Sequence, residues 1–414
     1  MSILPSDSHY DLIVIGGGSI GLSTAYHATK RGMKTLVLER YGFFNDDGSS
    51  AGASRQFRLQ YAQRYMAELC LAAQSWWADL QSHTQSTLIG LSGSVWFGDP
   101  DVSSQEGGIA ESERVMSALS IPYTKLDAEQ IEQTYNFQNL PTHDRGFFQA
   151  NGGIINLKVA EQAAYSAAAA SGLAEFRAYE PVTGLSSDSA GISVSTASGT
   201  LTADRLAITS GAYTNQVVAH LGLQVPYFIW AMSSAYFRKT DPGTQCPTWF
   251  YFGKEKDYYG FPEVPWSYPG YIRCAPDFAD KVISDPADRP AGPDPHNLAL
   301  TSEFVARNMT GLDPTPQFPA TCLIALSSDS TKELLLDYVP SSIPNNKRIV
   351  VYTAGWAAKL IPILGDMICE MLTSDVTDFT YNNFSVPQSN FSIGWRESSD
   401  KPDLSAVPVR RVRK

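Results

Sequence analysis

Residues 11 to 39 read DLIVIGGGSIGLSTAYHATKRGMKTLVLE, and this stretch decides the fold. The apolar run at 11–15 is typical of a strand that is buried on both faces, as strands of parallel sheets are. Apolar residues recur at helical spacing over 19–32, and a second apolar run follows at 34–38. A strand, a helix and a strand within about thirty residues form a β-α-β unit. The predicted fold class is therefore α/β with a Rossmann-like sheet.

The turn between the first strand and the helix carries Gly16, Gly18 and Gly21 in the pattern GxGxxG. These glycines permit a tight turn and close approach to a pyrophosphate, to which the helix N-terminus presents N–H groups and a positive dipole. Glu39 ends the second strand, where an acidic side chain accepts hydrogen bonds from an adenosine ribose. The stretch predicts a dinucleotide site, and a chance glycine turn is the alternative. Further contacts of this site are expected from Ser19, Ile20 and Arg40.

The composition excludes several classes of protein. With 414 residues, 43% of them hydrophobic, the chain can bury the core of two domains. A net charge of −11 argues against a general binder of nucleic acid or anionic membranes. The five cysteines are scattered without a CxxC pair, which disfavours a disulfide framework or a zinc site. No signal-peptide pattern or membrane-length apolar stretch is present, so we expect a soluble, cytoplasmic protein.

The middle of the chain differs in amino-acid composition from its ends. Aromatic residues and prolines crowd together over 225–275, and residues 280–297 form a loop rich in Pro and Asp. Strand patterns return at 322–326 and 347–353. We expect a discontinuous dinucleotide-binding domain with a second domain, built on an antiparallel sheet, inserted into it. The expected bounds are 1–85, 150–215 and 321–395 for the first domain, 86–149 and 216–320 for the second, and 396–414 for a tail.

The discontinuity favours FAD over NAD as the dinucleotide. An NAD dehydrogenase would usually complete a six-stranded fold before its catalytic domain. Here ITSGAY at 208–213 follows a strand near the middle of the chain, and its small residues, including Gly211, let the backbone approach a flavin cofactor. An ordinary turn at the end of a strand is the alternative for this segment.

Five separated stretches of the chain resemble the monomeric sarcosine oxidase family of FAD-dependent amine oxidases, which includes pipecolate and piperideine-carboxylate oxidases. The stretches are residues 11–40, 54–61, 258–277, 322–340 and 354–365. Together they span nearly the whole chain. The resemblance implies FAD as the cofactor, bound by the discontinuous Rossmann-like domain, and an inserted substrate domain.

Residues 54–58, SRQFR, resemble the T-R-x-x-R motif of that family. By this likeness Ser54 and Arg55 lie against the flavin, and Arg58 binds the carboxylate of the substrate. A guanidinium suits this role because its fork matches a carboxylate bidentately. Two solvated arginines on a loop are the alternative.

Residues 354–359, AGWAAK, resemble the family motif G-H-G-F-K. The likeness places Gly355 at the flavin and Lys359 at both the flavin and the substrate carboxylate. Trp356 replaces the usual Phe, as in the piperideine-carboxylate oxidase, and is expected in the active site.

Cys322 matches the cysteine to which the family attaches the flavin 8α-methyl group through a thioether. The alternative is a buried structural cysteine, the usual environment of a free thiol. Asp337 and Pro340 follow at the family's spacing and favour attachment. A tyrosine common two residues after the cysteine is Ile324 here, so one phenol of the family's substrate pocket is missing.

Residues 258–277 depart most from sarcosine oxidase. Arg273 falls where the family has the lysine that promotes oxygen reduction, and Asp277 falls where sarcosine oxidase has a histidine. Tyr258 matches a tyrosine of the substrate pocket, with one more packed aromatic residue as the alternative. A solvated aspartate is the alternative for Asp277.

The resemblance implies oxidation of the C–N bond next to the carboxylate of a secondary or cyclic amino acid, with hydride transfer to flavin N5 and reduction of O2 to H2O2. A flavin-dependent amine dehydrogenase that uses another electron acceptor is the second reading, favoured by Arg273 in place of lysine. A flavin-binding protein without catalytic activity is the third. We further expect a monomer that binds an amino acid and O2, without a metal, a nucleic acid or a membrane.

Overall fold

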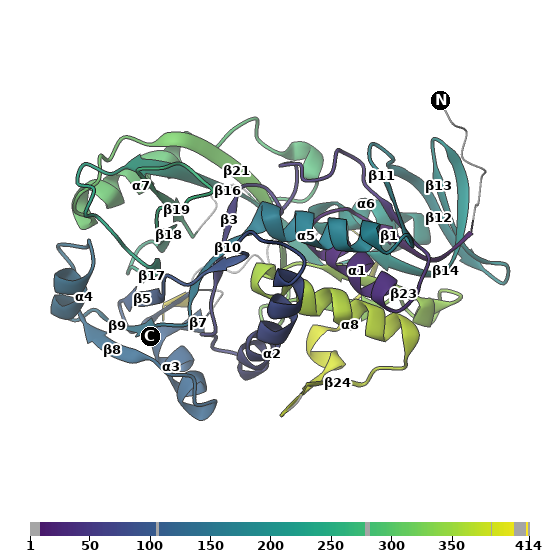
Figure 1. The fold of residues 1–414 in the computed structure, drawn as a ribbon, viewed down its shortest axis with the longest axis horizontal. Helices are drawn as coiled ribbons and strands as arrows, with labels where there is room; N and C mark the ends of the chain where they lie inside the picture. The colour runs from purple at the N-terminus through teal and green to yellow at the C-terminus, as the bar shows by residue number, and fades with distance from the viewer. Residues whose placement is uncertain (1–8, 105–106, 278–281, 382, 401–410, 413–414) are drawn as a thin grey trace.

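A computed structural model describes residues 9–104, 107–277, 282–381, 383–400 and 411–412 of the chain. Figure 1 shows two regions side by side, each built around a large sheet. Among the described residues, no helix has both the length and the apolar character needed to cross a bilayer.

The first region contains an eight-stranded sheet with the order β11–β2–β1–β14–β13–β12, to which β23 adds beside β14 and β22 beside β23. The strands β11, β2, β1, β14 and β23 run parallel to one another, whereas β12, β13 and β22 pair antiparallel. The strands are β1 His9–Ile15, β2 Thr35–Leu38, β11 Ala174–Arg177, β12 Val182–Asp188, β13 Gly191–Thr196, β14 Gly199–Ile208, β22 Leu335–Tyr338 and β23 Ile349–Thr353. The Rossmann-like fold class is thereby confirmed.

Four helices pack around this sheet: α1 Ser19–Lys30, α2 Arg64–Gln81, α5 Leu157–Ala170 and α8 Ile361–Thr373. Helix α1 connects β1 to β2 and lies against α5 and α8. The contact with α8 is close because Gly365 faces Ser23, where a Cβ would overlap the serine side chain. Ten of the thirteen residues of α8 are buried, as expected for a helix between the sheet and other helices.

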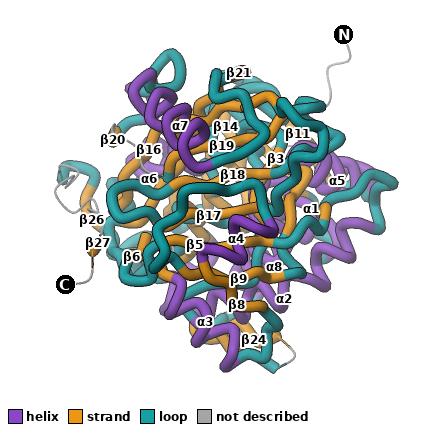
Figure 2. The backbone as a smooth tube through the Cα atoms, turned by 90° about the vertical axis from the view of Figure 1, so that its left-hand side faces the viewer, coloured by secondary structure: helices purple, strands orange, loops and turns teal. Residues whose placement is uncertain are grey.

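The second region contains a nine-stranded sheet with the order β20–β16–β19–β18–β17–β5–β9–β8, and β21 pairs with β16. Its pairs are antiparallel except for β17 and β5. In Figure 2, α7 and α3 lie on opposite sides of the strands β17, β5 and β9. The elements are β5 Ser94–Gly98, β8 Thr124–Asp127, β9 Arg145–Gln149, β16 Tyr227–Arg238, β17 Thr248–Phe252, β18 Tyr258–Phe261, β19 Tyr271–Pro276, β20 Val282–Ile283, β21 Gln317–Ser327, α3 Ile109–Ala118, α4 Ala128–Thr134 and α7 Pro295–Asn308.

Short elements complete the fold. They are β3 Ser54–Phe57, β4 Ile89–Gly90, β6 Val102–Ser104, β7 Gly107–Gly108, β10 Gly153–Asn156, β15 Leu223–Gln224, β24 Asp378–Tyr381, β25 Phe384–Pro387, β26 Arg396–Glu397, β27 Arg411–Val412 and α6 Thr214–Val218. The domain bounds expected from the sequence remain a prediction, and the one at residue 321 falls inside β21. Of the expected tail, β26 pairs with β15 and β27 with β6, whereas residues 401–410 and 413–414 lie outside the described residues.

Candidate active site

The glycine turn after β1 leaves a stretch of bare backbone beside the sheet. Gly16 has a φ of +106°, and a Cβ there would lie 2.8 Å from the carbonyl oxygen of Thr209. A Cβ at Gly21 would overlap the carbonyl oxygen of Gly16, and one at Gly18 would lie 3.1 Å from Ser50 Oγ. The turn therefore needs glycine, and it exposes backbone to a ligand.

The N-terminus of α1 lies at the end of this turn and suits an anion. Its N-cap is Gly18, which has no side chain to cap the helix, and its first turn carries no acidic residue. The Ser19 N–H donates to Ser50 Oγ over 3.1 Å, and the Ser19 hydroxyl donates to Glu161 over 2.8 Å. The helix dipole and its free N–H groups favour negative charge at this point.

Glu39, at the end of β2, is 7% exposed and accepts hydrogen bonds from the N–H groups of Gly17 and Tyr41, over 2.7 and 2.9 Å. Burial raises the pKa of its carboxyl group, while these hydrogen bonds oppose that shift. Arg40 follows it, and its guanidinium lies 4.6 Å from the ring centre of Tyr213. These residues line the same cavity as the glycine turn.

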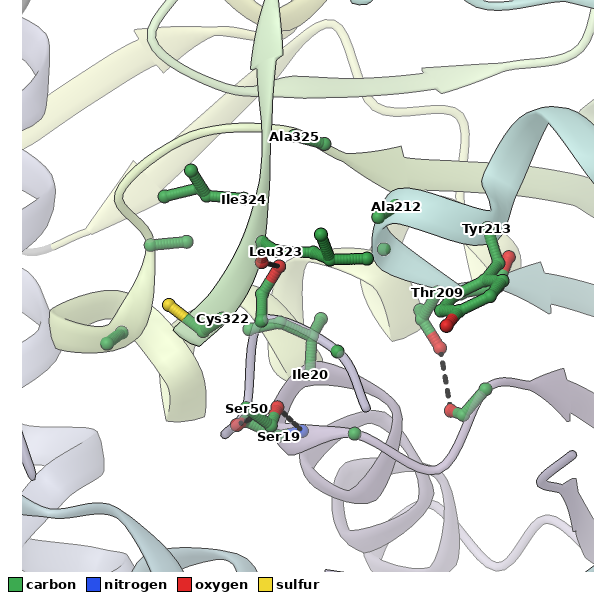
Figure 3. Close-up of a pocket in the computed structure, with 18 of the residues that line it drawn as sticks. Ser19, Ile20, Ser50, Thr209, Ala212, Tyr213, Cys322, Leu323, Ile324 and Ala325 are labelled. Carbon is green, nitrogen blue, oxygen red and sulfur yellow. Dashed lines mark hydrogen bonds between the residues drawn. The ribbon is translucent and has the colours of Figure 1, made fainter. Parts of the chain in front are cut away.

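One cavity extends from this turn to the strands of the second region. We call its first part the dinucleotide end, lined by Gly16, Gly18, Ser19, Ile20, Glu39, Arg40 and Gly211, and its second part the chamber, lined by Met232, Phe250, Tyr259, Phe261, Arg273, Asp277, Cys322, Ile324, Gly355, Trp356 and Lys359. Figure 3 shows Ser19 and Ser50 at the start of α1, near the strand that carries Cys322 and Ile324. Arg55 also lines the cavity.

Cys322 is half-buried in β21 and is not in a disulfide. Side chains alternate across a strand, so Cys322 shares a face with Ile324. Cys322, Trp356 and Tyr259 all pack against the apolar cluster that contains Ile324 and Met232. The thiol thus lies on the cavity wall within an apolar patch.

Arg58 and Lys359 lie close together but in different positions. Lys359 lines the cavity and is 4% exposed, whereas Arg58 is fully buried and does not line it. Their charged groups lie on the same aromatic ring, that of Tyr61, at 4.4 Å for Arg58 and 5.0 Å for Lys359. Arg58 is also 4.5 Å from the ring of Trp96 and donates to the carbonyl oxygen of Gln60. Of the two cations expected to touch a substrate, only Lys359 lies on the cavity wall.

Arg273 in β19, Asp277 directly after it, and the distant Trp356 line the chamber together. The Arg273 guanidinium lies 5.2 Å from the Phe261 ring and donates to the carbonyl oxygen of Ser54 over 3.3 Å. Arg273 Nε and the indole Nε1 of Trp356 are buried and have no hydrogen-bond partner among the described residues. Both are N–H donors beside the cavity, so a ligand with acceptor atoms would satisfy them.

Tyr258 points away from the cavity. Its ring stacks on Phe304 at 4.3 Å, inside the core of the second region, and its hydroxyl lies 3.4 Å from the carbonyl oxygen of Leu300. Tyr259 is the tyrosine that lines the chamber, and burial raises its pKa to about 12. The alternation of side chains along β18 places Tyr259 and Phe261 on one face and Tyr258 on the other. Of the two tyrosines, Tyr259 and not Tyr258 therefore lies on the cavity wall.

Three further expected residues shape the backbone around the chamber. Gly355 has a φ of +91°, and a Cβ there would overlap the carbonyl oxygen of Glu333. The Arg55 guanidinium donates to the carbonyl oxygens of Ser49 and Ala51, both over 2.6 Å. Ser54 is buried outside the cavity lining, where its hydroxyl accepts from Trp266 Nε1 over 3.3 Å.

Comparison with known proteins identifies the family. The profile of the DAO family, described as FAD dependent oxidoreductase, matches residues 11–371. The chain belongs to this family. It is therefore an FAD-dependent oxidoreductase.

The relatives of this flavoprotein include two sarcosine oxidases. It is 24% identical to monomeric sarcosine oxidase of Bacillus sp. strain NS-129, over 92% of this chain and 97% of that one, and 26% identical to human peroxisomal sarcosine oxidase, over 87% and 92%. A protein of Dictyostelium discoideum named as a bifunctional amine oxidase is 31% identical over 96% of this chain, which spans only 39% of that longer protein.

Among solved structures, the open form of NikD, an unusual amino acid oxidase essential for nikkomycin biosynthesis, matches with a TM-score of 0.86. It is 34% identical, and the match covers 96% of this chain and 99% of that chain. Glycine oxidase from Geobacillus kaustophilus matches with a TM-score of 0.71 at 17% identity, which shows a shared fold.

The residues of the oxidoreductase fit FAD. The bare backbone of Gly16 and Gly21 and the N-terminus of α1 suit a pyrophosphate, and Glu39 at the end of β2 suits a ribose. The apolar chamber beyond Cys322 suits a planar ring. The buried donors on Arg273 and Trp356 lie where polar atoms of a ligand would satisfy them.

Sequence reasoning missed several residues of the site. Tyr259, Phe261 and Phe250 lie in the aromatic strip that was recognised, but only their position on the strands shows which of them face the cavity. The alternation of β18 was a usable signal for Tyr259. Around Arg58, Tyr61 is only three residues away, whereas Trp96 is distant in sequence and carried no signal.

Proposed function

We propose that this FAD-dependent oxidoreductase is an oxidase of a secondary or cyclic amino acid. It would oxidise the C–N bond next to the carboxylate and reduce O2 to H2O2. The observation that carries this proposal is the cavity that joins a dinucleotide end to an aromatic chamber containing Lys359. The relatives named as sarcosine oxidases and as an amino acid oxidase support the reaction class.

The carboxylate of the substrate would bind at Lys359. This ammonium group is nearly buried, and Arg58 adds a second buried positive charge. Both charged groups contact the ring of Tyr61. A carboxylate bound at Lys359 would interact favourably with both positive charges. We assign direct contact to Lys359 and electrostatic support to Arg58.

The rest of the chamber would hold the substrate amine and side chain. Met232, Ile324 and Trp356 offer an apolar wall of a size that suits a ring, and the missing phenol at Ile324 leaves that wall apolar. Asp277 supplies a carboxylate for an N–H group of the substrate. With its pKa raised to about 12, Tyr259 stays a neutral phenol at physiological pH and can donate a hydrogen bond.

FAD, when bound, accepts two electrons from the substrate and passes them to O2. The protein's share is orientation: Lys359 fixes the carboxylate, and the apolar wall excludes water, so the reacting bond is held in place. The substrate must react as the free amine, because an ammonium group has no lone pair to assist C–H cleavage. Arg273 would stabilise negative charge that develops on oxygen.

We also propose that Cys322 holds the flavin through a thioether. Its position on the cavity wall supports this role, because the thiol borders the apolar chamber in which the flavin ring would lie. Denaturation in acid or detergent should leave yellow fluorescence on the wild-type chain, and Cys322→Ser should release it. Complete release of FAD from the wild type would refute the attachment.

The alternative is an amine dehydrogenase of the same fold that passes electrons to another acceptor, favoured by an arginine at 273 where the oxidases of the family have lysine. Measurement of oxygen uptake separates the two readings. With a substrate that reduces the flavin, the oxidase consumes O2 and forms an equal amount of H2O2. Flavin reduction without oxygen uptake would establish the dehydrogenase instead.

A further inference from the structure

The strand that carries Cys322 has one edge that no other strand covers among the described pairings, since β21 pairs only with β16. Alternate carbonyl groups of a strand point to the same side. Three of them, on this side of β21, accept hydrogen bonds from three separate segments. The acceptors are the carbonyl oxygens of Thr321, Leu323 and Ala325.

Arg289 provides the contact directly before Cys322. Its Nη2 donates to the carbonyl oxygen of Thr321 over 3.1 Å, and its Nη1 donates to the carbonyl oxygen of Asp46 over 3.1 Å. The guanidinium also lies 3.7 Å from a carboxylate oxygen of Asp47. One planar side chain therefore joins β21 to the loop after β2, although it belongs to the Pro- and Asp-rich segment that the sequence presented as an ordinary loop.

Ser49 provides the contact directly after Cys322. Its hydroxyl donates to the carbonyl oxygen of Leu323 over 2.6 Å, and Ser49 lies in the same loop as Asp46. The Gly355 N–H donates to the carbonyl oxygen of Ala325 over 2.9 Å. The backbone on both sides of Cys322 is thus fixed to the loop that lines the cavity.

The same loop is held from its other side by Lys158 on α5. The ammonium group donates to the carbonyl oxygens of Phe44, Asn45 and Ser50 over 2.9 to 3.0 Å and lies 3.1 Å from a carboxylate oxygen of Asp46. Lys158 thus fixes the loop to the dinucleotide end, whereas Arg289 fixes it to β21. Lys158 and Arg289 thus hold the same loop against two different elements.

We propose that Arg289 is a positioning residue for the covalent attachment of FAD, because it holds the backbone before Cys322 in register with the loop that lines the cofactor cavity. This inference rests on the attachment proposed above. Arg289 does not line the cavity, so it acts through the Thr321 carbonyl group rather than by contact with the cofactor. A shift of one residue in the pairing of β21 with β16 would turn the Cys322 sulfur to the other face of the strand.

The attachment reaction forms one bond and breaks two. The Cys322 sulfur forms a C–S bond to the 8α-methyl carbon of the flavin, the S–H bond and one C–H bond of the methyl group break, and the two electrons and two protons reduce the ring system. Molecular oxygen then accepts them as H2O2. The reaction needs no other oxidant, and its rate depends on how close the sulfur is held to the methyl group.

The test compares Arg289→Met with Lys158→Met in the full chain, produced with limiting riboflavin and then supplied with FAD in air. Flavin that stays on the denatured chain is measured against time, and FAD affinity is measured separately in a Cys322→Ser background. For Arg289→Met we expect attachment to slow by about tenfold or more, because β21 loses its charge-assisted link to the loop. FAD affinity should stay within about threefold of the parent, because Lys158 still holds that loop. For Lys158→Met we expect FAD affinity to fall by about tenfold and attachment at saturating FAD to proceed at nearly the wild-type rate.

The outcomes separate this inference from the attachment on which it rests. Wild type without covalent flavin refutes both. Covalent flavin in wild type and equally fast attachment in Arg289→Met refutes the role of Arg289 alone. An equal loss of FAD affinity in both variants would also overturn it, because Arg289 would then act on the loop as Lys158 does. Arg289→Lys, which keeps the charge but cannot bridge both carbonyl groups, should attach at an intermediate rate.

Discussion

The two ends of the cavity differ in which atoms line them, with backbone atoms prominent at the dinucleotide end and side chains in the chamber. At the dinucleotide end, the backbone of Gly16, Gly18 and Gly21 and the start of α1 belong to one continuous segment and leave room for a ligand. The chamber is formed by side chains from β17, β18, β19, β21 and the turn before α8, which lie far apart in sequence. The first end therefore depends on the absence of side chains, and the second on which way side chains point.

This difference determines what substitutions do. At Gly16 and Gly21 an added Cβ collides with backbone, which cannot move away without breaking the turn. In the chamber a side chain can be shortened without displacing the strand that carries it. We therefore expect changes at the dinucleotide end to remove the cofactor, and changes in the chamber to alter substrate binding while the cofactor stays.

The largest effect should come from Gly21→Ala. Its Cβ would overlap the carbonyl oxygen of Gly16, so the turn must open to admit it. Overpacking of this kind costs about 1–3 kcal/mol, which corresponds to FAD affinity lower by up to about 100-fold. Flavin content after gel filtration and titration with FAD measure this loss.

Gly394→Ala is the matched control, because no atom lies within 4 Å of a Cβ at that position and its φ is ordinary for an L-residue. It should bind FAD as the wild type does. A Gly21→Ala protein with normal flavin content would contradict the close-packed turn.

Lys359→Met should have the next largest effect. Loss of a charge-assisted contact costs about 1.5–3 kcal/mol, so we expect affinity for a carboxylate-bearing inhibitor to fall by about tenfold or more. Flavin spectral titration of the purified protein gives that affinity directly. An amine inhibitor without a carboxylate serves as control and should bind both proteins alike; equal losses for both inhibitors would show that Lys359 supports the chamber generally.

The neighbouring tyrosines test the orientation of β18. Tyr259→Phe removes a phenol that lines the chamber, whereas Tyr258→Phe removes one that packs against Phe304. One hydrogen bond is worth about 1 kcal/mol, so Tyr259→Phe should lower kcat/KM by about fivefold and Tyr258→Phe should leave it unchanged. The loss should be constant from pH 6 to about 10, because the pKa of Tyr259 is raised to about 12 and the phenol stays protonated throughout. The reverse order of the two variants would show that the strand faces the other way.

The smallest effect is expected for Asp277→Asn, and it concerns selectivity. If the carboxylate meets an N–H group of a ring amino acid, its neutralisation should reduce the preference for L-proline or L-pipecolate over sarcosine by a few-fold, about 1 kcal/mol. Ratios of kcat/KM for the three compounds measure this. Identical ratios in both proteins would place Asp277 outside the substrate contacts.

The same contrast explains how much the sequence could predict. The β-α-β unit and its glycine turn are local, because the apolar periodicity and three glycines lie within thirty residues, and they were predicted with their positions. The pairing of β17 with β5, more than 140 residues apart, is set by packing of the whole sheet and left no local signal. The fold class was therefore predictable, while the strand order of the second region was not.

Within the chamber, the direction in which each side chain points could not be predicted from the sequence. The motif around Arg58 was recognised, but its burial between Tyr61 and Trp96 depends on β5, a strand much further along the chain. At 258 and 259 two adjacent tyrosines competed for one role, and a register error of one residue exchanges the faces of a strand. Arg289 lay in a segment whose Pro and Asp content indicates only a loop.

The central claim is that the chamber presents an amino acid to bound flavin for oxidation of its C–N bond. Anaerobic mixing of the purified protein with L-proline, L-pipecolate, a dehydropipecolate and N-methyl amino acids tests it most directly. We predict that at least one ring amino acid bleaches the flavin absorption, and that air restores it with formation of H2O2. A flavin that stays oxidised with every amine in the panel, in protein fully loaded with FAD, would contradict the account.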